Sequence, residues 1–237
     1  MIDILAIGAH PDDVELGAAG TLLRQMHRGN SIAICDLTAG ELGTRGDKHS
    51  RAIEAANSSK ILGIEHRINL ELKDGFFGTD EASLLKLVAV IRHFKPRIVL
   101  ANAIYDRHPD HGEGSKFASK ASFLSGLRKI ETKFNDVIQE EHRPSAVYHY
   151  VQDRFITPDF VVDITPYFDK KMEAIFAFSS QFYNPNSAEP ETPISSKNYI
   201  QFLEGRAREM GRMIGVTYGE GFKIERPLGI KDLGELL

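Results

Sequence analysis

Two short stretches of the sequence carry side chains whose types and spacing could perform hydrolytic chemistry. The first is GAHPDDVELG at residues 8–17, and the second is ANAIYDRHPDH at residues 101–111; each follows or completes an apolar run. Together they contribute six candidate side chains: His10, Asp12, Asp13, His108, Asp110 and His111. Adjacent carboxylates at the end of a buried strand are costly unless a cation neutralises them. The two stretches therefore indicate a site for a cation.

The spacing of these residues suits a divalent metal. His10 and Asp13 lie three residues apart, which puts them on one side of a first helical turn, and His111 could complete the set from the other stretch. Two histidines and a carboxylate form a ligand set for catalytic zinc, which leaves one coordination position for water. Iron(II) and cobalt(II) accept the same donors, so the sequence does not select the metal.

Other interpretations of the two stretches compete with a metal site. A dinucleotide-binding loop is disfavoured, because Gly8, Gly17 and Gly20 lack the G-x-G-x-x-G spacing and the carboxylates would repel a pyrophosphate. Asp12 and Asp13 could instead cap a helix N-terminus. Residues 108–111 could form a solvated turn. The occurrence of both motifs at the ends of strands favours the metal site over these alternatives.

The rest of the sequence predicts the scaffold that must position these residues. Short β-branched runs are typical of buried parallel strands, and we expect four of them at residues 2–8, 31–37, 66–70 and 97–101. Helical spacing of apolar residues predicts helices between them at 17–28, 48–62 and 81–94. Further along we expect strands at 146–151 and 160–164, a helix beginning near 166, a loop at 181–196, a helix at 198–213 and a loose C-terminal tail. This alternation indicates an α/β protein with a doubly wound sheet.

The predicted topology brings the two stretches together. Ligands of open parallel sheets bind beyond the carboxyl ends of the strands, where the strand order reverses. In the common order 3-2-1-4, the strands at 2–8 and 97–101 are neighbours across that point. We therefore expect both stretches to line one crevice.

Composition limits the class of protein. The chain has 237 residues, of which 42% are hydrophobic and 26% charged, which fits a single globular domain spanning residues 1–237. A net charge of -4 provides no basic field for nucleic acid or a membrane surface. Cys35 is the only cysteine, which excludes an intrachain disulfide. Without a membrane-spanning apolar run or a secretory leader, the sequence predicts a cytoplasmic protein.

The combination of AHPDDVELG with HPDH resembles the PIG-L/LmbE-type zinc deacetylases, which hydrolyse the N-acetyl group of N-acetylglucosamine conjugates. Within that family, SQFYNP at 180–185 and FLEGRAREMGRMIGVTYGEGF at 202–222 are similar to the N-acetylglucosaminyl-malate deacetylases of bacillithiol biosynthesis. The resemblance implies a Rossmann-like three-layer sandwich with a mostly parallel sheet and additional C-terminal strands and helices. It also implies a small-molecule sugar conjugate as substrate and a homo-oligomer, commonly a hexamer.

The resemblance assigns a role to each candidate side chain. The zinc ligands would be His10, Asp13 and His111. Asp12 would be the general base, beside a ligand but free to take a proton from water and return it to the amine. A protonated His108 would stabilise the oxyanion, and Asp110 would orient or charge a histidine.

Contacts to the substrate are less sharply defined by the sequence. Arg51 resembles the family's substrate-binding arginine, and a guanidinium would suit a malate carboxylate. Arg45 is the rival candidate, and either could instead pair with an acidic residue on a solvated helix face. Some relatives carry a tyrosine where this sequence has Asp106; Tyr183 or Tyr199 could substitute, although packing roles are favoured for both.

Two alternatives to the malate conjugate follow from the same residues. One is a deacetylase of another N-acetylated sugar or of a chitooligosaccharide, which substrate profiling would distinguish. The other is a noncatalytic sugar-binding module, which would bind its ligand without metal and which the presence of Asp12 disfavours.

Overall fold

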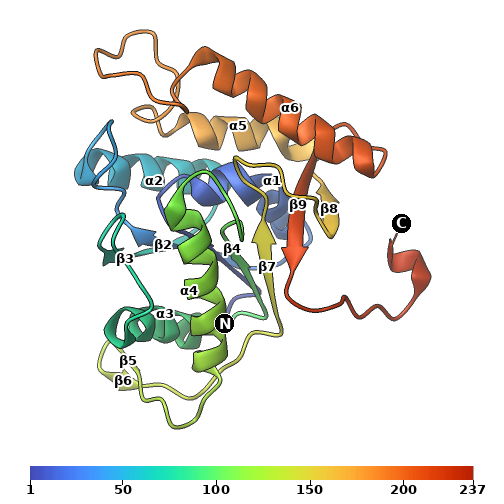
Figure 1. Cartoon of the computed structure of the whole chain (residues 1–237). Coiled ribbons are helices and arrows are strands. Elements are labelled where there is room, and N and C mark those ends of the chain that lie inside the picture. The colour runs from blue at the N-terminus through green and yellow to red at the C-terminus, as the bar shows by residue number, and fades with distance from the viewer. Residues whose placement is uncertain (237) are drawn as a thin grey trace.

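A seven-stranded sheet runs through the middle of the computed structural model, which describes residues 1–236 (Figure 1). In spatial order its strands are β3 (His66–Leu72), β2 (Ile32–Thr38), β1 (Ile4–Gly8), β4 (Ile98–Ala101), β7 (Ala146–Tyr150), β9 (Gly219–Ile224) and β8 (Phe160–Asp163). The first five pair in parallel, whereas β9 is antiparallel to both β7 and β8. The predicted order 3-2-1-4 is therefore confirmed.

Helices cover both faces of the sheet. They are α1 (Asp13–His27), α2 (Lys48–Leu62), α3 (Glu81–Phe94), α4 (Pro109–Ser125), α5 (Phe168–Phe176) and α6 (Lys197–Met213), with short 3-10 turns at Thr165–Tyr167 and Leu233–Leu236. Figure 1 shows α1, α2 and α5 on one face and α3 and α4 on the other, with α6 outside α5. A small hairpin of β5 (Lys133–Phe134) and β6 (Val137–Ile138) lies apart from the main sheet. The predicted three-layer α/β fold is confirmed.

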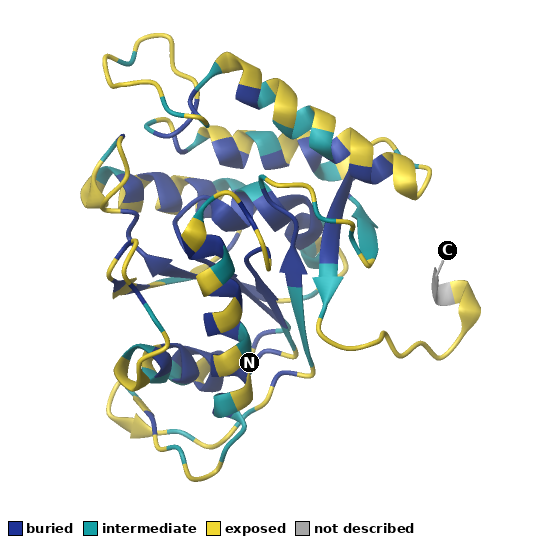
Figure 2. Cartoon of the chain, in the orientation of Figure 1, coloured by how far each residue is buried: buried dark blue, intermediate teal, exposed yellow. Residues whose placement is uncertain are grey.

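The central strands are held by burial on both sides. Every residue of β1 and β2 is buried, because these β-branched runs contact helices above and below the sheet (Figure 2). One apolar cluster packs the sheet against α3 and α4, through residues such as Leu87 and Phe117. A second packs it against α1 and α5, through Leu22 and Ala174. The floor of the site is therefore a rigid part of the molecule.

The strand order reverses between β1 and β4, and both motifs lie there. β1 runs directly into residues 9–12 and α1, and β4 runs into residues 102–108 and α4. Because β1 and β4 are parallel neighbours, the two loops leave the same edge of the sheet side by side. The expected convergence of the two motifs is confirmed.

Two elements of the main fold, α4 and β9, were not predicted. The HPDH motif begins α4, because Pro109 at the first helical position has its φ fixed for a helix, so the alternative of a solvated turn at residues 108–111 is wrong. The C-terminal tail contains β9, which was not predicted because its two glycines disfavour a strand. A Cβ at Gly221 would lie 2.8 Å from the Met210 sulfur, so the glycine allows α6 to pack on this strand.

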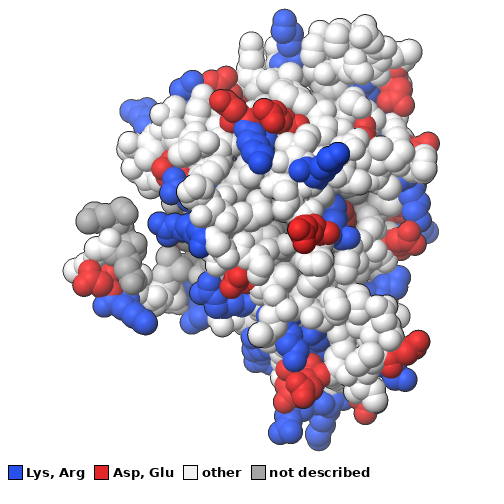
Figure 3. Space-filling model, turned by 180° about the vertical axis from the view of Figure 1, so that it is seen from behind, with Lys and Arg blue, Asp and Glu red and all other residues white. Residues whose placement is uncertain are grey.

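Charges of both signs are interspersed on the surface. Figure 3 shows lysine and arginine side chains among aspartate and glutamate on the face opposite to the view of Figure 1. Within the part of the chain that the structure describes, no helix is both long and apolar enough to span a membrane.

Candidate active site

The loop between β1 and α1 has a strained backbone at Asp12. Its φ of 121° is unfavourable for a residue with a side chain, and such strain is tolerated where surrounding contacts impose it. Asp12 precedes α1, but its side chain makes no capping hydrogen bond, so the interpretation of Asp12 as a helix cap is wrong. The Asp12 carboxylate is buried and turned to other partners.

The Asp13 carboxylate is surrounded by donors. Its Oδ2 accepts hydrogen bonds from the His10 backbone N–H at 2.9 Å and from Asn102 Nδ2 at 2.9 Å. Its Oδ1 accepts from Gln152 Nε2 at 3.0 Å and lies 3.0 Å from His111 Nε2. Asn102 also accepts from the Ala9 N–H at 2.8 Å, so the same amide ties Asp13 to the end of β1. Both oxygens of the Asp13 carboxylate are therefore held in position by two contacts each.

In each of two histidines, carboxylates contact the ring nitrogen that points away from Asp13; we call it the outer nitrogen. His10 Nε2 lies 3.0 Å from Asp74 Oδ1 and 3.3 Å from Asp110 Oδ2. His111 Nδ1 contacts Asp106 Oδ2. When a carboxylate accepts the N–H of one ring nitrogen, the other nitrogen keeps a free lone pair, which is how proteins orient imidazole ligands. In both rings that other nitrogen faces Asp13, since His10 Nδ1 lies 3.5 Å from Asp13 Oδ2.

The electrostatics of this cluster favour positive charge. Although burial acts in the opposite direction, the neighbouring carboxylates raise the pKa of His10 well above its ordinary value and that of His111 to about 9. Burial likewise opposes ionisation of Asp13, but the two imidazoles hold its pKa well below the usual range. A site that stabilises extra protons on adjacent imidazoles also stabilises a divalent cation in their place.

Two groups of side chains have ligand atoms close enough to share a metal ion. The nitrogens of His10, His108 and His111 lie within 4.8 Å of one another. The same holds for His10 with Asp74 and Asp110. In the second group, the two carboxylates lie close together because both contact His10 Nε2, so no metal ion is needed to explain their positions. The first group, which adjoins Asp13, contains the two predicted histidine ligands and matches the donor chemistry of zinc.

Asp12 is held by Arg51. Arg51 Nη2 lies 3.1 Å from Asp12 Oδ2 and also donates to the Pro11 carbonyl, and both side chains are almost fully buried. Burial raises the pKa of Asp12 to about 7, against the opposing charge of Arg51. Gly40 makes room for the guanidinium: its φ is +66°, and a Cβ there would lie 2.6 Å from Arg51 Nη1. The guanidinium is thus enclosed beside Asp12 rather than free at the rim.

His108 begins α4, where its Nδ1 accepts a hydrogen bond from the Asp110 backbone N–H at 3.2 Å. This acceptor role places the proton of the neutral ring on Nε2. Burial and the neighbouring His10 and His111 lower the pKa of His108 below its ordinary value. The neutral ring can therefore still donate one hydrogen bond from Nε2.

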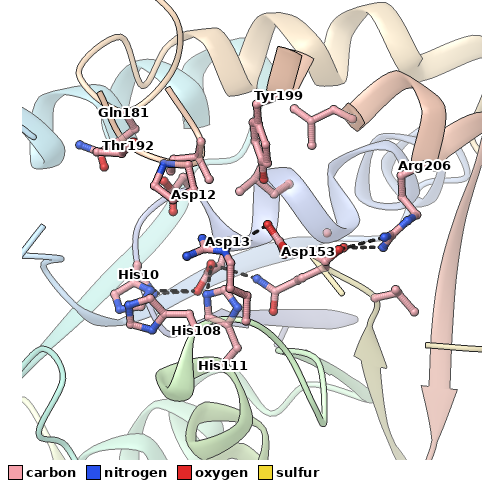
Figure 4. Close-up of a pocket in the computed structure, with 18 of the residues that line it drawn as sticks. His10, Asp12, Asp13, His108, His111, Asp153, Gln181, Thr192, Tyr199 and Arg206 are labelled. Atoms are coloured by element: carbon pink, nitrogen blue, oxygen red, sulfur yellow. Dashed lines mark hydrogen bonds and ion pairs between the residues drawn. The ribbon is translucent and has the colours of Figure 1, made fainter. Parts of the chain in front are cut away.

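The remaining predicted substrate residues also reach the cavity. Arg45 is buried, and its Nε lies 3.4 Å from Glu189 of the loop at 181–196. Gln181 from the same loop donates to the Arg45 carbonyl at 2.6 Å. Tyr199 is buried against Phe182, consistent with packing, and its ring points into the cavity (Figure 4).

Most of these groups border one cavity of about 330 Å³. Figure 4 shows His10, Asp13, His108 and His111 on its floor, with Tyr199 reaching down from α6. Of the candidate residues from the sequence, eight line the cavity: His10, Asp12, Asp13, Arg45, Arg51, His108, His111 and Tyr199. Asp110 lies behind His10, and its predicted role in orienting a histidine stays a prediction.

Sequence reasoning missed four side chains that hold the cluster: Asp74, Asn102, Asp106 and Gln152. Asn102 directly follows β4, and Asp74 and Gln152 lie two residues beyond β3 and β7. Their shared signal is a polar residue within two positions after a parallel strand. Asp106 was noted only as a missing tyrosine, although its place five residues before His111 could have identified it.

Comparisons with known proteins agree with this geometry. A family model described as PIG-L, GlcNAc-PI de-N-acetylase, matches residues 5–122. Diacetylchitobiose deacetylase of Thermococcus kodakarensis is 28% identical over 232 residues, which is 93% of this chain and 82% of that protein. A probable N-acetyl-alpha-D-glucosaminyl L-malate deacetylase 2 of Bacillus cereus is 26% identical over 196 residues, 75% of this chain and 83% of that protein.

Among solved structures, a conserved protein from Thermus thermophilus superimposes with a TM-score of 0.86 at 34% sequence identity, covering 98% of this chain and 99% of that one. The shared fold extends through α6 and β9, well beyond the residues that the family model matches. The motifs after β1 and β4, the matching family model and this superposition lead to one assignment: the chain belongs to the PIG-L family of de-N-acetylases.

Proposed function

We propose that this protein is a metal-dependent hydrolase that releases acetate from the nitrogen of an N-acetylglucosamine conjugate. The family to which it belongs contains deacetylases of N-acetylated sugars. The observation that carries the proposal is the arrangement of Asp12 beside His10, Asp13 and His111 on one cavity, with the outer nitrogens of both histidines engaged by carboxylates.

His10, Asp13 and His111 would hold the metal ion, with iron(II) and cobalt(II) as alternatives to zinc. When bound, zinc supplies Lewis acidity, which polarises an amide carbonyl and makes water more acidic. The residues around the ligands supply rigidity: Asn102 and Gln152 hold the Asp13 carboxylate, as described above. Metal sites commonly depend on such partners for affinity.

Asp12 would move the proton. Its carboxylate takes one proton from the attacking water as the water oxygen bonds to the carbonyl carbon, and it returns that proton to the amine nitrogen as the C–N bond breaks. A pKa near 7 suits both transfers, since the group must lose and gain a proton at the same pH. Arg51, at 3.1 Å, keeps the carboxylate oriented and favours its ionised form.

His108 would stabilise the negative charge that develops on the carbonyl oxygen. Its Nδ1 is engaged by the backbone of Asp110, so Nε2 is the nitrogen available as a donor. The sequence led us to expect a protonated ring. The hydrogen bond at Nδ1 and the lowered pKa support a neutral ring that donates one hydrogen bond instead.

The nature of the conjugate is a separate question. The sequence resemblance favours malate as the group attached to the sugar, whereas the Thermococcus relative is named for diacetylchitobiose. A malate carboxylate would require an available guanidinium. Arg51 is already engaged by Asp12, Pro11 and Gln181, which argues against it as a carboxylate clamp. We therefore propose the N-acetylglucosamine conjugate as the substrate class without malate as a requirement.

An amine-release assay on purified protein of known metal content tests the proposal. The wild type should form the free amine (glucosamine from N-acetylglucosamine, the glucosaminyl conjugate from a conjugate) and acetate in equal amounts. Asp12→Asn should retain the bound metal and lose turnover by a factor of about 10² or more, the usual effect of removing a general base. Asp80→Asn, at the exposed N-terminus of α3, removes one carboxylate elsewhere and is the matched control.

Two results would contradict the proposal. Full turnover by Asp12→Asn would remove the base from the mechanism. Sugar binding that does not require metal, with no amine release by the metal-loaded wild type, would identify the protein as a noncatalytic binding module.

A further inference from the structure

The cavity extends well beyond the catalytic residues. We call the part that is bordered by residues of α1 and α6 the channel; the whole cavity, at about 330 Å³, is larger than an acetyl group requires. One face of α6 borders it through Tyr199, Leu203, Arg206, Ala207 and Met210. These positions recur every three to four residues from Tyr199 to Met210, so the stripe is roughly 16 Å long. The channel therefore offers space for a part of the substrate beyond the acetyl group.

The opposite wall comes from α1 and from the ends of two strands. Leu16 and Gly17 lie one turn beyond Asp13 on the same face of α1. Val151 follows β7, and Gly219 begins β9. With the α6 stripe, these residues give the channel walls that are mainly apolar.

The charged groups that border the channel are already paired. Lys171 donates to Glu220 Oε1 at 2.6 Å and to the Leu16 carbonyl at 2.8 Å, and Glu220 also accepts from the backbone of α1. Arg206 donates to the Gln152 and Asp153 carbonyls at 2.7 and 2.9 Å, and its Nε lies 3.6 Å from the exposed carboxylate of Glu209. Arg107 Nε lies 3.3 Å from Asp153 Oδ2.

A negatively charged ligand in this channel would compete with the carboxylates of Asp153, Glu209 and Glu220 for these cations. The Lys171–Glu220 pair is buried, and breaking it would leave an uncompensated charge, which is strongly unfavourable. A neutral ring with an apolar face, by contrast, would contact Leu203 and Met210 without disturbing any pair. The charge balance therefore selects against an anionic group.

We infer that the channel binds the aglycone of the N-acetylglucosamine conjugate, and that this aglycone is a neutral ring with an apolar face. A second pyranose and an aryl group share this chemistry. The inference rests on the proposed deacetylase function and adds to it a preference for neutral over anionic conjugates.

The test compares four substrates with metal-loaded protein: N-acetylglucosamine, diacetylchitobiose, the p-nitrophenyl glycoside of N-acetylglucosamine, and N-acetylglucosaminyl-malate. We expect kcat/KM for at least one neutral conjugate to exceed that for N-acetylglucosamine and for the malate conjugate by about ten-fold or more. The two neutral substrates distinguish a sugar from an aryl aglycone.

Substitutions at Leu203 link the preference to the channel. Leu203→Ala should lower the ratio of kcat/KM for the preferred neutral conjugate to that for N-acetylglucosamine by about ten-fold, because one apolar contact is lost. Leu203→Arg introduces an unpaired cation and should shift the preference toward the malate conjugate. Met213→Ala, an exposed methionine at the end of α6, is the matched control and should keep the wild-type ratio. Circular dichroism and the melting temperature confirm that each variant folds.

Three outcomes would overturn the inference while leaving the proposed function intact. They are a preference for the malate conjugate, equal kcat/KM for all four substrates, and faster hydrolysis of a long-chain N-acyl glucosamine, which would assign the channel to the acyl group. Failure to release amine from any N-acetylated substrate would instead contradict the proposed function itself.

Discussion

Replacement of Asn102 tests how the fold prepares the proposed metal site. The Asn102 side chain is fully buried and makes three hydrogen bonds, to the Ala9 N–H, to Asp13 Oδ2 and to Gln152 Oε1. Asn102→Ala removes all three. At about 1 to 1.5 kcal/mol for each bond, we expect a loss of roughly 3 to 4.5 kcal/mol in the free energy of unfolding of the metal-free protein.

The same substitution should weaken metal binding. Asp13 Oδ2 would lose its bond to Nδ2, and Gln152 would lose the partner that aligns it toward Asp13 Oδ1. Loss of comparable partners in metal sites weakens affinity by about 10- to 100-fold, which corresponds to roughly 1.4 to 2.8 kcal/mol. Asn102→Ala keeps the Asp13 carboxylate but no longer holds it in position.

Two measurements separate these effects. Urea unfolding in the presence of a chelator reports the hydrogen-bond loss alone, and a zinc titration against a chromophoric chelator reports the affinity. Asn69→Ala is the matched control, because Asn69 Nδ2 donates to the Thr38 carbonyl at 2.7 Å at the same edge of the sheet but does not contact Asp13. It should lower stability without changing zinc affinity. If Asn102→Ala also binds zinc as tightly as the wild type, the amide does not position Asp13 and the reasoning is refuted.

Three further predictions concern other parts of the site. His111→Ala should lower the zinc content of purified protein and abolish the stabilisation that zinc gives the wild type in thermal unfolding; unchanged zinc content by elemental analysis would exclude His111 as a ligand. Arg51→Ala should lower kcat for N-acetylglucosamine by about 10- to 100-fold, because the proposed base Asp12 loses its partner. A rise in KM confined to the malate conjugate would instead show that Arg51 binds the malate carboxylate. Arg67→Leu should lower the free energy of unfolding, measured in urea, by about 3 to 5 kcal/mol, because the buried carboxylates of Glu15 and Asp36, each 2.7 Å from Arg67, lose their cation. A loss below about 1 kcal/mol would show that these carboxylates are protonated or hydrated when the arginine is absent.

The middle of the sheet could be predicted from sequence because β1 and β2 are buried on both faces. Such strands read as continuous apolar runs, and the helices between them keep a clear apolar periodicity. The order of β3, β2, β1 and β4 then followed from general rules of topology. That order was enough to bring His10 and His111 to one cavity from stretches about a hundred residues apart.

The missed features depend on contacts that no local pattern records. β9 contains glycines because α6 packs closely against it, and this proximity appears only in the folded chain. Similarly, the partner of His111 is Asp106 and that of His10 is Asp74, which follows a different strand. The enclosure of Arg51 beside Asp12 requires Gly40 from a third loop, so its contact with the base was not predictable from spacing.

The residues before α5 and the C-terminal part of the chain contribute differently to the site. Residues before α5 supply the candidate metal ligands and the proposed base, and the family model matches only this part. The C-terminal part instead contacts the middle of α1: Glu220 accepts from the backbone N–H groups of Gly20 and Thr21, and Lys171 donates to the Leu16 carbonyl. These contacts fix the direction of the helix that begins after Asp12, and α6 forms the outer wall of the channel. Substitutions in α6 can therefore alter which conjugate fits without changing a metal ligand, whereas substitutions at Glu220 should affect both, because this residue borders the channel and supports α1.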